Sequence, residues 1–261
     1  MNRMFSPSDL GRTLKPFVFL DFLHGDVKRD GLNFGFHPHS GIATLTYSLN
    51  AAVHYTDTEG VDGTLEPGGL EWMKAGGGAW HKSSFRGPIS DMVAFQFWFA
   101  LPAEIEDGPS ESLYITPRQV PKKGNYKVLV GEYGGLRSPV PCPLDVNVIE
   151  VIFERSGDEF VYTYPAGHST SYAFVHSGSA FVGDAENESS DNEIFVLDVY
   201  GEMLTVKATQ DKTRVIIASG VPHAHSLSLG MYSVHTSPES LARGEAKIEK
   251  IGDQMKRDGK M

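Results

Sequence analysis

The sequence predicts an all-β protein made of two antiparallel β-barrels, with short helices that include one near the C-terminus. Short runs rich in β-branched and aromatic residues recur along the chain, and 28 glycines supply tight turns between them. With 261 residues, the chain is long enough for two domains that each bury a core of their own. We therefore expect one barrel in each half.

In the first half, strand-like runs lie at residues 17–23, 42–49, 51–56, 70–73 and 92–99. The run at 92–99 is apolar at nearly every position, which is typical of a strand buried on both faces. The runs at 42–49 and 51–56 follow each other closely, and we expect them to pair.

Two polar, proline-containing stretches, residues 101–121 and 137–143, interrupt the strand pattern. We place the boundary at the second stretch, which gives an N-terminal barrel at residues 1–136 and a C-terminal barrel with a terminal helix at residues 137–261. Strand-like runs in the second half lie at residues 146–153, 159–164 and 171–176.

Helices are expected near both ends of the chain. Ser6 followed by Pro7 suits the start of a short helix near residues 6–10. Ser237, followed by Pro238 and a glutamate, suits the start of a longer helix to about residue 250.

Composition limits the partners and the location. Lysine and arginine number 23 against 33 acidic residues, a formal charge of −10, which argues against direct binding of nucleic acid or an anionic membrane. A small molecule or a regulatory protein is the expected partner. Cys142 is the single cysteine and cannot form an internal disulfide. With no signal-peptide pattern and no apolar run of about 20 residues, we expect a cytoplasmic protein.

His37 and His39 have the spacing of metal ligands on a strand. Residues two apart project to the same face, so both imidazoles can point into a barrel. Pro38 suits an edge or the mouth of a barrel. The further ligand has to come from a distant segment, and His81, after the glycines at 76–78, is the best candidate; a histidine that merely lines the barrel is the alternative. Imidazole suits zinc, copper, iron and nickel.

The sequence does not predict that His54, His223 or His225 binds the metal. His54 alternates within a strand-like run, and we expect it to support the ligands from behind. His223 and His225 also have ligand spacing, but they follow a turn, and we expect a solvated loop rather than a second metal site. The glycine run at 76–78 lacks the lysine of a phosphate-binding loop and is expected to form a tight turn.

Several motifs make the chain similar to the pirin family. Residues 19–22 (FLDF) resemble its opening motif, residues 36–41 (FHPHSG) its HPHRG, and residues 67–76 (PGGLEWMKAG) its PGDxQWMTAG. Residues 233–239 resemble the segment before its last helix. The resemblance spans nearly the whole chain and implies a bicupin, in which two antiparallel barrels of double-stranded β-helix type are packed together and the first holds a metal.

The resemblance also implies a ligand set. Family members bind iron or another divalent metal through positions that correspond here to His37, His39, His81 and Ser83, where the last is a glutamate in the family. Serine is a poor ligand for a divalent ion, so Ser83 is a departure in the fourth position. A second family glutamate, soon after HPH, is also missing, with Ala43 near its place.

Some pirins are similar to quercetin 2,3-dioxygenases, and others are metal-dependent partners of transcription regulators. The expectation is therefore a quercetinase-like dioxygenase acting on an aromatic enol or flavonol with O2. One iron(II) is expected, with Zn, Ni, Cu, Mn or Co as alternatives, and Phe36, Trp72 and Trp80 are expected to line the pocket. The alternatives are a non-enzymatic regulator that binds a protein partner, which the loss of the glutamate favours, and a degenerate cupin without metal.

Overall fold

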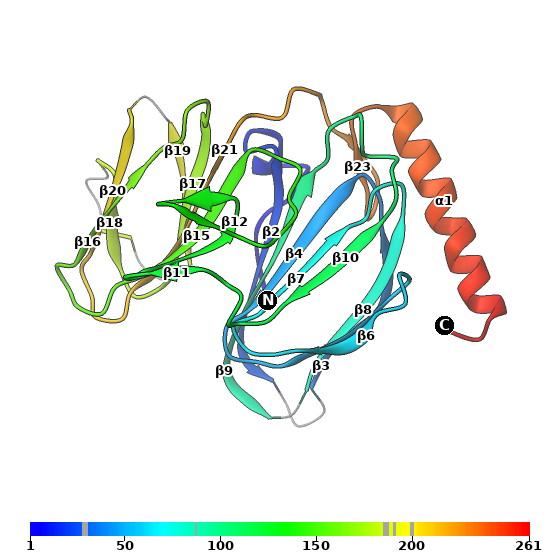
Figure 1. Cartoon of the computed structure of the whole chain (residues 1–261), viewed down its shortest axis with the longest axis horizontal. Coiled ribbons are helices and arrows are strands. Elements are labelled where there is room, and N and C mark those ends of the chain that lie inside the picture. The colour runs from blue at the N-terminus through cyan, green and yellow to red at the C-terminus, as the bar shows by residue number, and fades with distance from the viewer. Residues whose placement is uncertain (28–30, 87, 185–187, 190–191, 199–200) are drawn as a thin grey trace. The chain divides into compact units, whose positions relative to one another are not determined.

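The structure is a computed structural model that describes residues 1–27, 31–86, 88–184, 188–189, 192–198 and 201–261 (Figure 1). The chain forms two compact units. Unit 1 consists of Met1–Gln119 and His223–Met261, and unit 2 consists of Val120–Pro222. The described residues are mostly in β-strands, as the sequence predicted.

Unit 1 contains two antiparallel sheets. Their strand orders are β1-β2-β9-β4-β7-β10 and β3-β8-β5-β6. The strands are β1 (Asn2–Phe5), β2 (Phe17–Val27), β3 (Leu32–His39), β4 (Ile42–Ser48), β5 (Val53–Asp57), β6 (Asp62–Leu65), β7 (Leu70–Lys74), β8 (Ala79–Phe85), β9 (Ile89–Ala100) and β10 (Glu111–Ile115), together with the small pair β22 (Ser228–Leu229) and β23 (Val234–His235).

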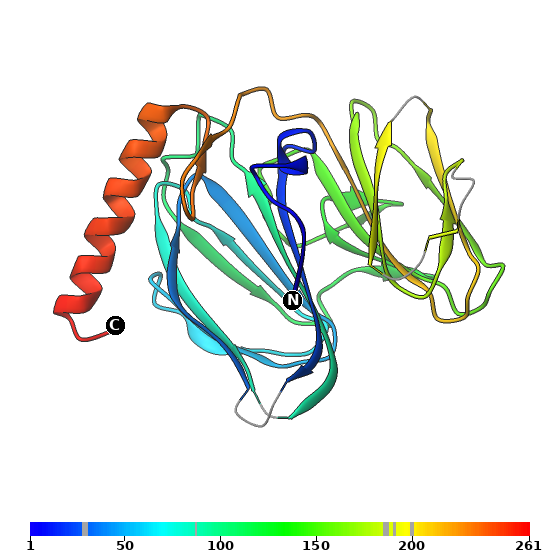
Figure 2. The same cartoon turned by 180° about the vertical axis from the view of Figure 1, so that it is seen from behind.

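The two sheets of unit 1 lie face to face and enclose an interior (Figure 2). β4 and β5 belong to different sheets, so the expected pairing of 42–49 with 51–56 is wrong. β4 pairs instead with β7 and β9, because its seven buried residues are covered on both sides only in the middle of a sheet. β9 lies between β2 and β4 in the same sheet, and most of its residues from Met92 to Phe99 are buried.

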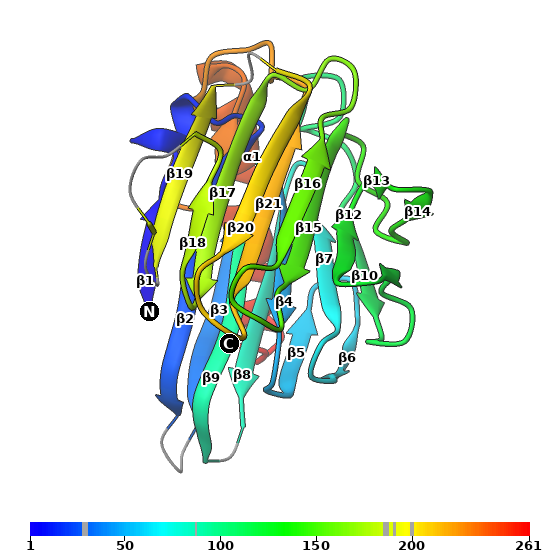
Figure 3. The ribbon, with the colours of Figure 1, turned by 90° about the vertical axis from the view of Figure 1, so that its left-hand side faces the viewer.

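Unit 2 has the same kind of architecture. A six-stranded sheet has the order β11-β12-β15-β21-β17-β19, and a three-stranded sheet has the order β16-β20-β18 (Figure 3). The strands are β11 (Lys122–Lys123), β12 (Tyr126–Val130), β13 (Glu132–Tyr133), β14 (Leu136–Arg137), β15 (Val146–Ile152), β16 (Glu159–Thr163), β17 (Thr170–Ser177), β18 (Ala180–Val182), β19 (Glu193–Asp198), β20 (Met203–Ala208) and β21 (Arg214–Gly220).

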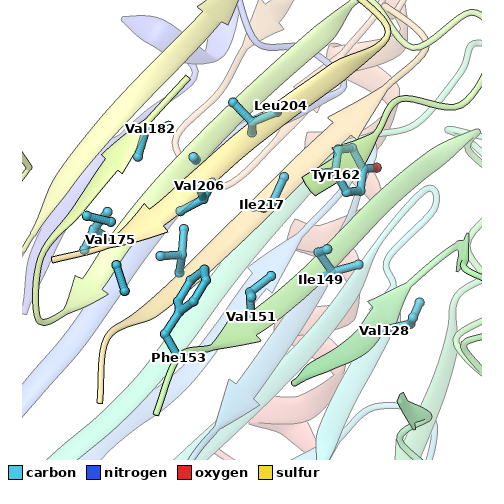
Figure 4. Packing of buried hydrophobic residues seen from close by; sticks show 14 residues of the cluster. Val128, Ile149, Val151, Phe153, Tyr162, Val175, Val182, Leu204, Val206 and Ile217 are labelled. Carbon is cyan, nitrogen blue, oxygen red and sulfur yellow. The ribbon is translucent and has the colours of Figure 1, made fainter. Parts of the chain in front are cut away.

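The interior of unit 2 is filled by apolar side chains. Ile149 and Val151 of β15, Val175 of β17 and Ile217 of β21 are fully buried in one cluster (Figure 4). Phe153 joins the same cluster at the end of β15. Alternate residues of each strand face this core, as the period of a strand requires.

The boundary between the units differs from the predicted one in two places. Residues before 137 already belong to unit 2, because Tyr126–Val130 pairs with β15. The chain after Pro222 returns to unit 1, where Val234 N donates to Ser40 O at 3.2 Å. The terminal helix therefore belongs to unit 1 and not to the second barrel.

Helix α1 (Pro238–Arg257) begins where the sequence predicted and continues past residue 250. The Ser237 side chain accepts a hydrogen bond from Ser240 N, which caps the first turn. Trp80 of β8 donates from Nε1 to Ile248 O at 2.8 Å, so the helix packs against the four-stranded sheet. None of the described helices combines the length and apolar character that a membrane-spanning helix requires.

The N-terminus differs from the expectation of a helix at residues 6–10. Asn2–Phe5 is strand β1, which pairs with β2, and a 3-10 turn follows at Leu10–Arg12. Asp9 caps that turn by accepting from Leu10 N, and it also accepts from Ser6 N at 2.7 Å. Aspartate therefore fills the role that the sequence suggested for serine.

Candidate metal centre

Three histidine side chains meet between the two sheets of unit 1. β3 carries His37 and His39, and β8 carries His81, which is the direct cross-strand partner of His37. The ring centroids are 4.4 Å apart for His37–His81, 5.1 Å for His37–His39 and 5.2 Å for His39–His81. One ligand atom from each ring lies within 4.8 Å of the others. Strand pairing thus brings together residues that are more than forty positions apart.

The chain turns sharply directly after His39. Gly41 has φ +72, and a Cβ there would lie 2.0 Å from Val234 O, so only glycine fits. Beside it, the Ser40 hydroxyl donates to Ser233 Oγ at 2.8 Å and lies 2.9 Å from His235 Nε2. These contacts hold the C-terminal segment against β3.

Each of the three rings has its Nδ1 beside a hydrogen-bond acceptor. His37 Nδ1 lies 2.8 Å from Gly35 O, and His39 Nδ1 lies 3.1 Å from Tyr232 O. His81 Nδ1 lies 3.3 Å from Glu71 Oε1. Because carbonyl and carboxylate oxygens only accept, each ring carries its proton on Nδ1 and leaves Nε2 as the basic nitrogen.

The free nitrogens fit a transition metal. His81 Nε2 is buried and has no hydrogen-bond partner among the described residues. An orphaned buried acceptor costs free energy unless something binds it. Three imidazole nitrogens within reach of one point are a donor set that zinc, copper, iron and nickel accept. The residues present therefore fit a metal ion.

The environment keeps the β3 imidazoles neutral. Burial, together with the neighbouring His81, lowers the pKa of His37 to about 4. Burial and the charges of His81 and His37 hold the pKa of His39 well below its usual 6.5. A metal therefore does not have to displace a proton from either ring at neutral pH.

Glu71 is a fully enclosed carboxylate behind His81. Its exposed fraction is 2%, and Oε2 accepts from Thr46 Oγ1 at 2.9 Å. Burial alone would raise the pKa of Glu71, but the hydrogen bonds from His81 and Thr46 and the charge of His81 together bring it below 4.5. The centre thus has a negative charge, placed behind His81 and away from the other two imidazoles.

The histidines lie in the wall of a cavity of about 550 Å³. Seven of its 21 lining residues are phenylalanine, tyrosine or tryptophan, and Phe19 stacks on Trp98 with ring centroids 4.2 Å apart. Trp98 also meets the edge of His39 at 4.9 Å. The other lining residues are Met1, Arg3, Asp21, Leu23, Asn33, Phe34, Gly35, Phe36, Thr46, Ser83, Phe85, Ala94, Phe95, Gln96, Met231 and Tyr232.

Two predicted residues line this cavity beside the histidines. Ser83 is two residues after His81 on β8, so it faces the same interior, and Phe36 reaches the cavity from the bulge between Phe34 and His37. The Lys82 ammonium also lies 4.7 Å from the centre of the Phe36 ring.

Three predicted residues lie elsewhere. His54 pairs with Ser84, on the outer face of the sheet, and its Nε2 lies 3.8 Å from Asp62 Oδ2. Trp80 precedes His81 and therefore points the opposite way, to α1. Trp72 follows Glu71 and is fully buried on the other face of its sheet, with its ring centroid 5.7 Å from Phe99. None of the three lines the cavity.

Glu71, Thr46 and the Tyr232 carbonyl are parts of the centre that sequence reasoning missed. A carboxylate inside the apolar run of residues 70–73 was the available signal for Glu71. Nothing local marked Thr46 or Tyr232, because their roles depend on which strands and segments become neighbours.

The second histidine pair is only partly solvated. His225 is exposed, as expected, but His223 is buried with its Nε2 3.0 Å from Leu101 O. The prediction of a solvated loop is therefore wrong for His223. The glycine run is a tight turn, as predicted, with Gly78 N donating to Ala75 O at 2.9 Å.

The comparisons with known proteins agree with this geometry. A model of the Pirin family matches residues 1–99. A protein of Vibrio cholerae named "Putative quercetin 2,3-dioxygenase" is 30% identical over 206 residues, covering 75% of this chain and 71% of that protein. A pirin-like protein of Caulobacter vibrioides is 28% identical over 228 residues, covering 83% and 77%.

Solved structures show the same fold. A quercetin 2,3-dioxygenase of Acinetobacter baumannii matches with a TM-score of 0.83 at 24% identity, over 97% of this chain and 89% of that one. A bacterial pirin of Escherichia coli, in complex with nickel(II), matches with a TM-score of 0.66 at 18% identity, over 84% and 90%. The molecule is therefore a two-barrel cupin, as predicted. Within that class, the chain belongs to the pirin family.

Proposed function

We propose that this chain is a metal-dependent oxidoreductase of the quercetin 2,3-dioxygenase type, which acts on a flavonol or another aromatic enol with O2. One observation carries the proposal: three imidazoles with engaged Nδ1 atoms converge in the wall of a cavity of about 550 Å³. The names of the Vibrio and Acinetobacter proteins support the reaction class.

The proposed ligands are His37, His39 and His81, and iron(II) is the leading ion. Zinc, nickel, copper, manganese and cobalt also accept imidazole. The bound metal would polarise a substrate oxygen and mediate the reaction with O2. Ser83 supplies no charge at the fourth position, which leaves that position to water or substrate.

The chain's own residues bind and orient the substrate. The stacked Phe19 and Trp98 form a flat aromatic wall that suits a planar ring system. Phe36 lines the same cavity and extends its apolar surface. A planar substrate bound against these walls would exclude water from the metal position, which would strengthen the electrostatic interactions there.

Oxygen uptake by the metal-loaded protein tests the proposal. The intact chain would be purified without chelator, analysed for metal, loaded with iron(II) or nickel(II) and assayed with a panel of flavonols. A dioxygenase incorporates both atoms of O2 into its substrate, so one O2 should disappear per flavonol, without an added reductant. The His81→Ala variant should lack this uptake, and the His225→Ala variant should keep it.

The second candidate is a non-enzymatic regulator that carries the metal and binds a protein partner. Ser83 favours it, because a serine in the cavity wall cannot act as the base for a substrate hydroxyl at neutral pH. Metal binding at one equivalent without turnover of any flavonol would favour this function. A protein that binds no added metal would support the third reading, a degenerate cupin.

A further inference from the structure

A row of polar side chains crosses the six-stranded sheet of unit 1 and ends behind the metal position. In the strand register, Arg3 is opposite Asp21, Asp21 is opposite Gln96, Gln96 is opposite Thr46, and Thr46 is opposite Glu71. Directly opposite residues project to the same face. The row therefore runs across five neighbouring strands on the face that the histidines occupy.

Most neighbours in the row are hydrogen-bonded. Arg3 donates twice to Asp21, at 2.9 and 3.1 Å. Thr46 Oγ1 lies 2.9 Å from Glu71 Oε2 and 3.0 Å from Gln96 Oε1. Glu71 in turn accepts from His81. Asp21, Thr46 and Glu71 are buried, so their polar atoms need hydrogen-bond partners.

The hydrogens of the row determine how Gln96 is oriented. Thr46 has a single hydroxyl proton, and the carboxylate of Glu71 can only accept it. Gln96 must then present its NH2 group to Thr46, since two acceptors cannot share one proton. The oxygen and nitrogen of an amide are assigned from their partners, so the Gln96 amide atom 3.0 Å from Thr46 Oγ1 is the nitrogen.

This orientation leaves an acceptor oxygen at the cavity. The far end of the Gln96 amide is buried and has no partner among the described residues, and Gln96 lines the cavity. Burying an acceptor without a donor has an unfavourable desolvation free energy. A ligand that donates a hydrogen bond to this oxygen offsets that cost. A phenolic or enolic hydroxyl is such a donor.

We propose that Gln96 accepts a hydrogen bond from the substrate hydroxyl, and that Thr46 and Glu71 couple this contact to the orientation of His81. The inference rests on the proposed function, since it concerns the same cavity and metal. Gln96 is the specificity-determining residue, and Thr46 and Glu71 are positioning residues. One rigid row would then set the substrate hydroxyl and one metal ligand relative to each other.

The positioning role is tested by metal affinity, without turnover. Thr46→Val removes the hydroxyl at nearly constant volume and should weaken zinc(II) binding, by competition with a chromophoric chelator, about tenfold. Thr46→Ser keeps the hydroxyl and should restore the affinity. Thr44→Val is the matched control, because Thr44 lies two residues away on the same strand, is also buried and has no hydrogen-bond partner among the described residues for its hydroxyl.

A zinc affinity in Thr46→Val that equals that of the wild type would overturn the positioning role. An equal loss of zinc affinity in Thr46→Val and Thr44→Val would also overturn it, because the effect would then come from packing. Circular dichroism and the melting temperature of each metal-free variant show that the fold is retained before affinities are compared.

The specificity role is tested by binding without oxygen. Anaerobic, zinc-loaded wild-type protein should bind 3-hydroxyflavone about tenfold more tightly than flavone, which lacks the hydroxyl. In Gln96→Met, with the metal position again filled by zinc(II), this preference should disappear. A wild-type protein that binds both compounds equally, or neither, overturns the role of Gln96. Absence of oxygen uptake alone would contradict the dioxygenase proposal and leave both binding results standing.

Discussion

The two units build similar antiparallel sheets and use their interiors in opposite ways. In unit 2 the interior positions carry aliphatic and aromatic residues such as Ile149, Phe153 and Ile217, which pack into a continuous core. In unit 1 the corresponding space holds three histidines, Glu71 and a cavity of about 550 Å³. The strand framework therefore does not decide function; the residues on its inward face do.

The difference also has a cost. Unit 1 buries the Glu71 carboxylate and its polar partners beside the cavity, and such groups add little stability for their desolvation. Unit 2 can therefore be tested as a stability element and unit 1 as a binding element, with matched substitutions in each.

The largest expected effect is the loss of an aromatic ring from the core of unit 2. Phe153→Ala should lower the free energy of unfolding by about 3–5 kcal/mol, because the ring is fully buried and leaves a void. Phe36→Ala, at the partly exposed wall of the cavity, should cost less than half as much. Urea denaturation of the two metal-free variants gives the comparison, and equal losses would contradict it.

A buried ion cluster in unit 2 should give the next largest effect. Glu150 accepts from Arg214 at 2.7 Å and from Lys127 at 3.0 Å, with His176 Nε2 at 3.6 Å. Burial alone would raise the pKa of Glu150, but the close contact with His176 and the charges of Arg214 and Lys127 hold it far below 4.5. Glu150→Gln should destabilise the protein at pH 7 by about 3 kcal/mol.

The same group predicts a pH dependence. Because the folded pKa of Glu150 lies below its unfolded value of 4.5, its contribution is complete above that pH and is lost as the pH falls toward the folded pKa. The difference in stability between wild type and Glu150→Gln should therefore shrink by up to about 1.4 kcal/mol per pH unit below pH 4.5. Melting curves from pH 7 to pH 3 measure it, and a difference that stays constant would show that Glu150 is not ionised in the folded protein.

A smaller effect is expected from restoring a carboxylate to the cavity of unit 1. Ser83→Glu places a negative charge on the face of β8 that carries His81, and zinc affinity should rise about tenfold or more. Without metal, the same change should lower the melting temperature through desolvation. Ser84→Glu puts the same charge on the opposite face of β8. It should neither raise the zinc affinity nor lower the melting temperature of the metal-free protein through desolvation. Unchanged affinity in Ser83→Glu would mean that residue 83 does not reach the metal.

The sequence predicts the fold class and the histidine triplet because both depend on local signals. The spacing of His37 and His39, the turn before His81 and the run of β-forming segments are visible without knowing which strands pair. Trp80 could also have been placed correctly, since a residue next to an inward-facing His81 has to face outward.

Other features depend on pairings that the sequence does not reveal. Glu71 supports His81 only because the two sheets of unit 1 face each other. Thr46 contacts Glu71 because β4 pairs with β7. We had expected β4 to pair with β5 instead. The return of residues after Pro222 to unit 1, which brings Tyr232 O to His39, is likewise a long-range contact.

The central claim is that His37, His39 and His81 hold one metal through Nε2 and that the barrel of unit 2 holds none. Long-range ¹H–¹⁵N spectra of the histidine side chains test it directly, in the metal-free protein and during titration with zinc(II). The account predicts a proton on Nδ1 of all three rings, followed by shifts of their Nε2 signals that are complete at one equivalent, with His168 and His176 unchanged. A proton on Nε2 of any of the three, or zinc-dependent shifts at His168 or His176, would contradict it.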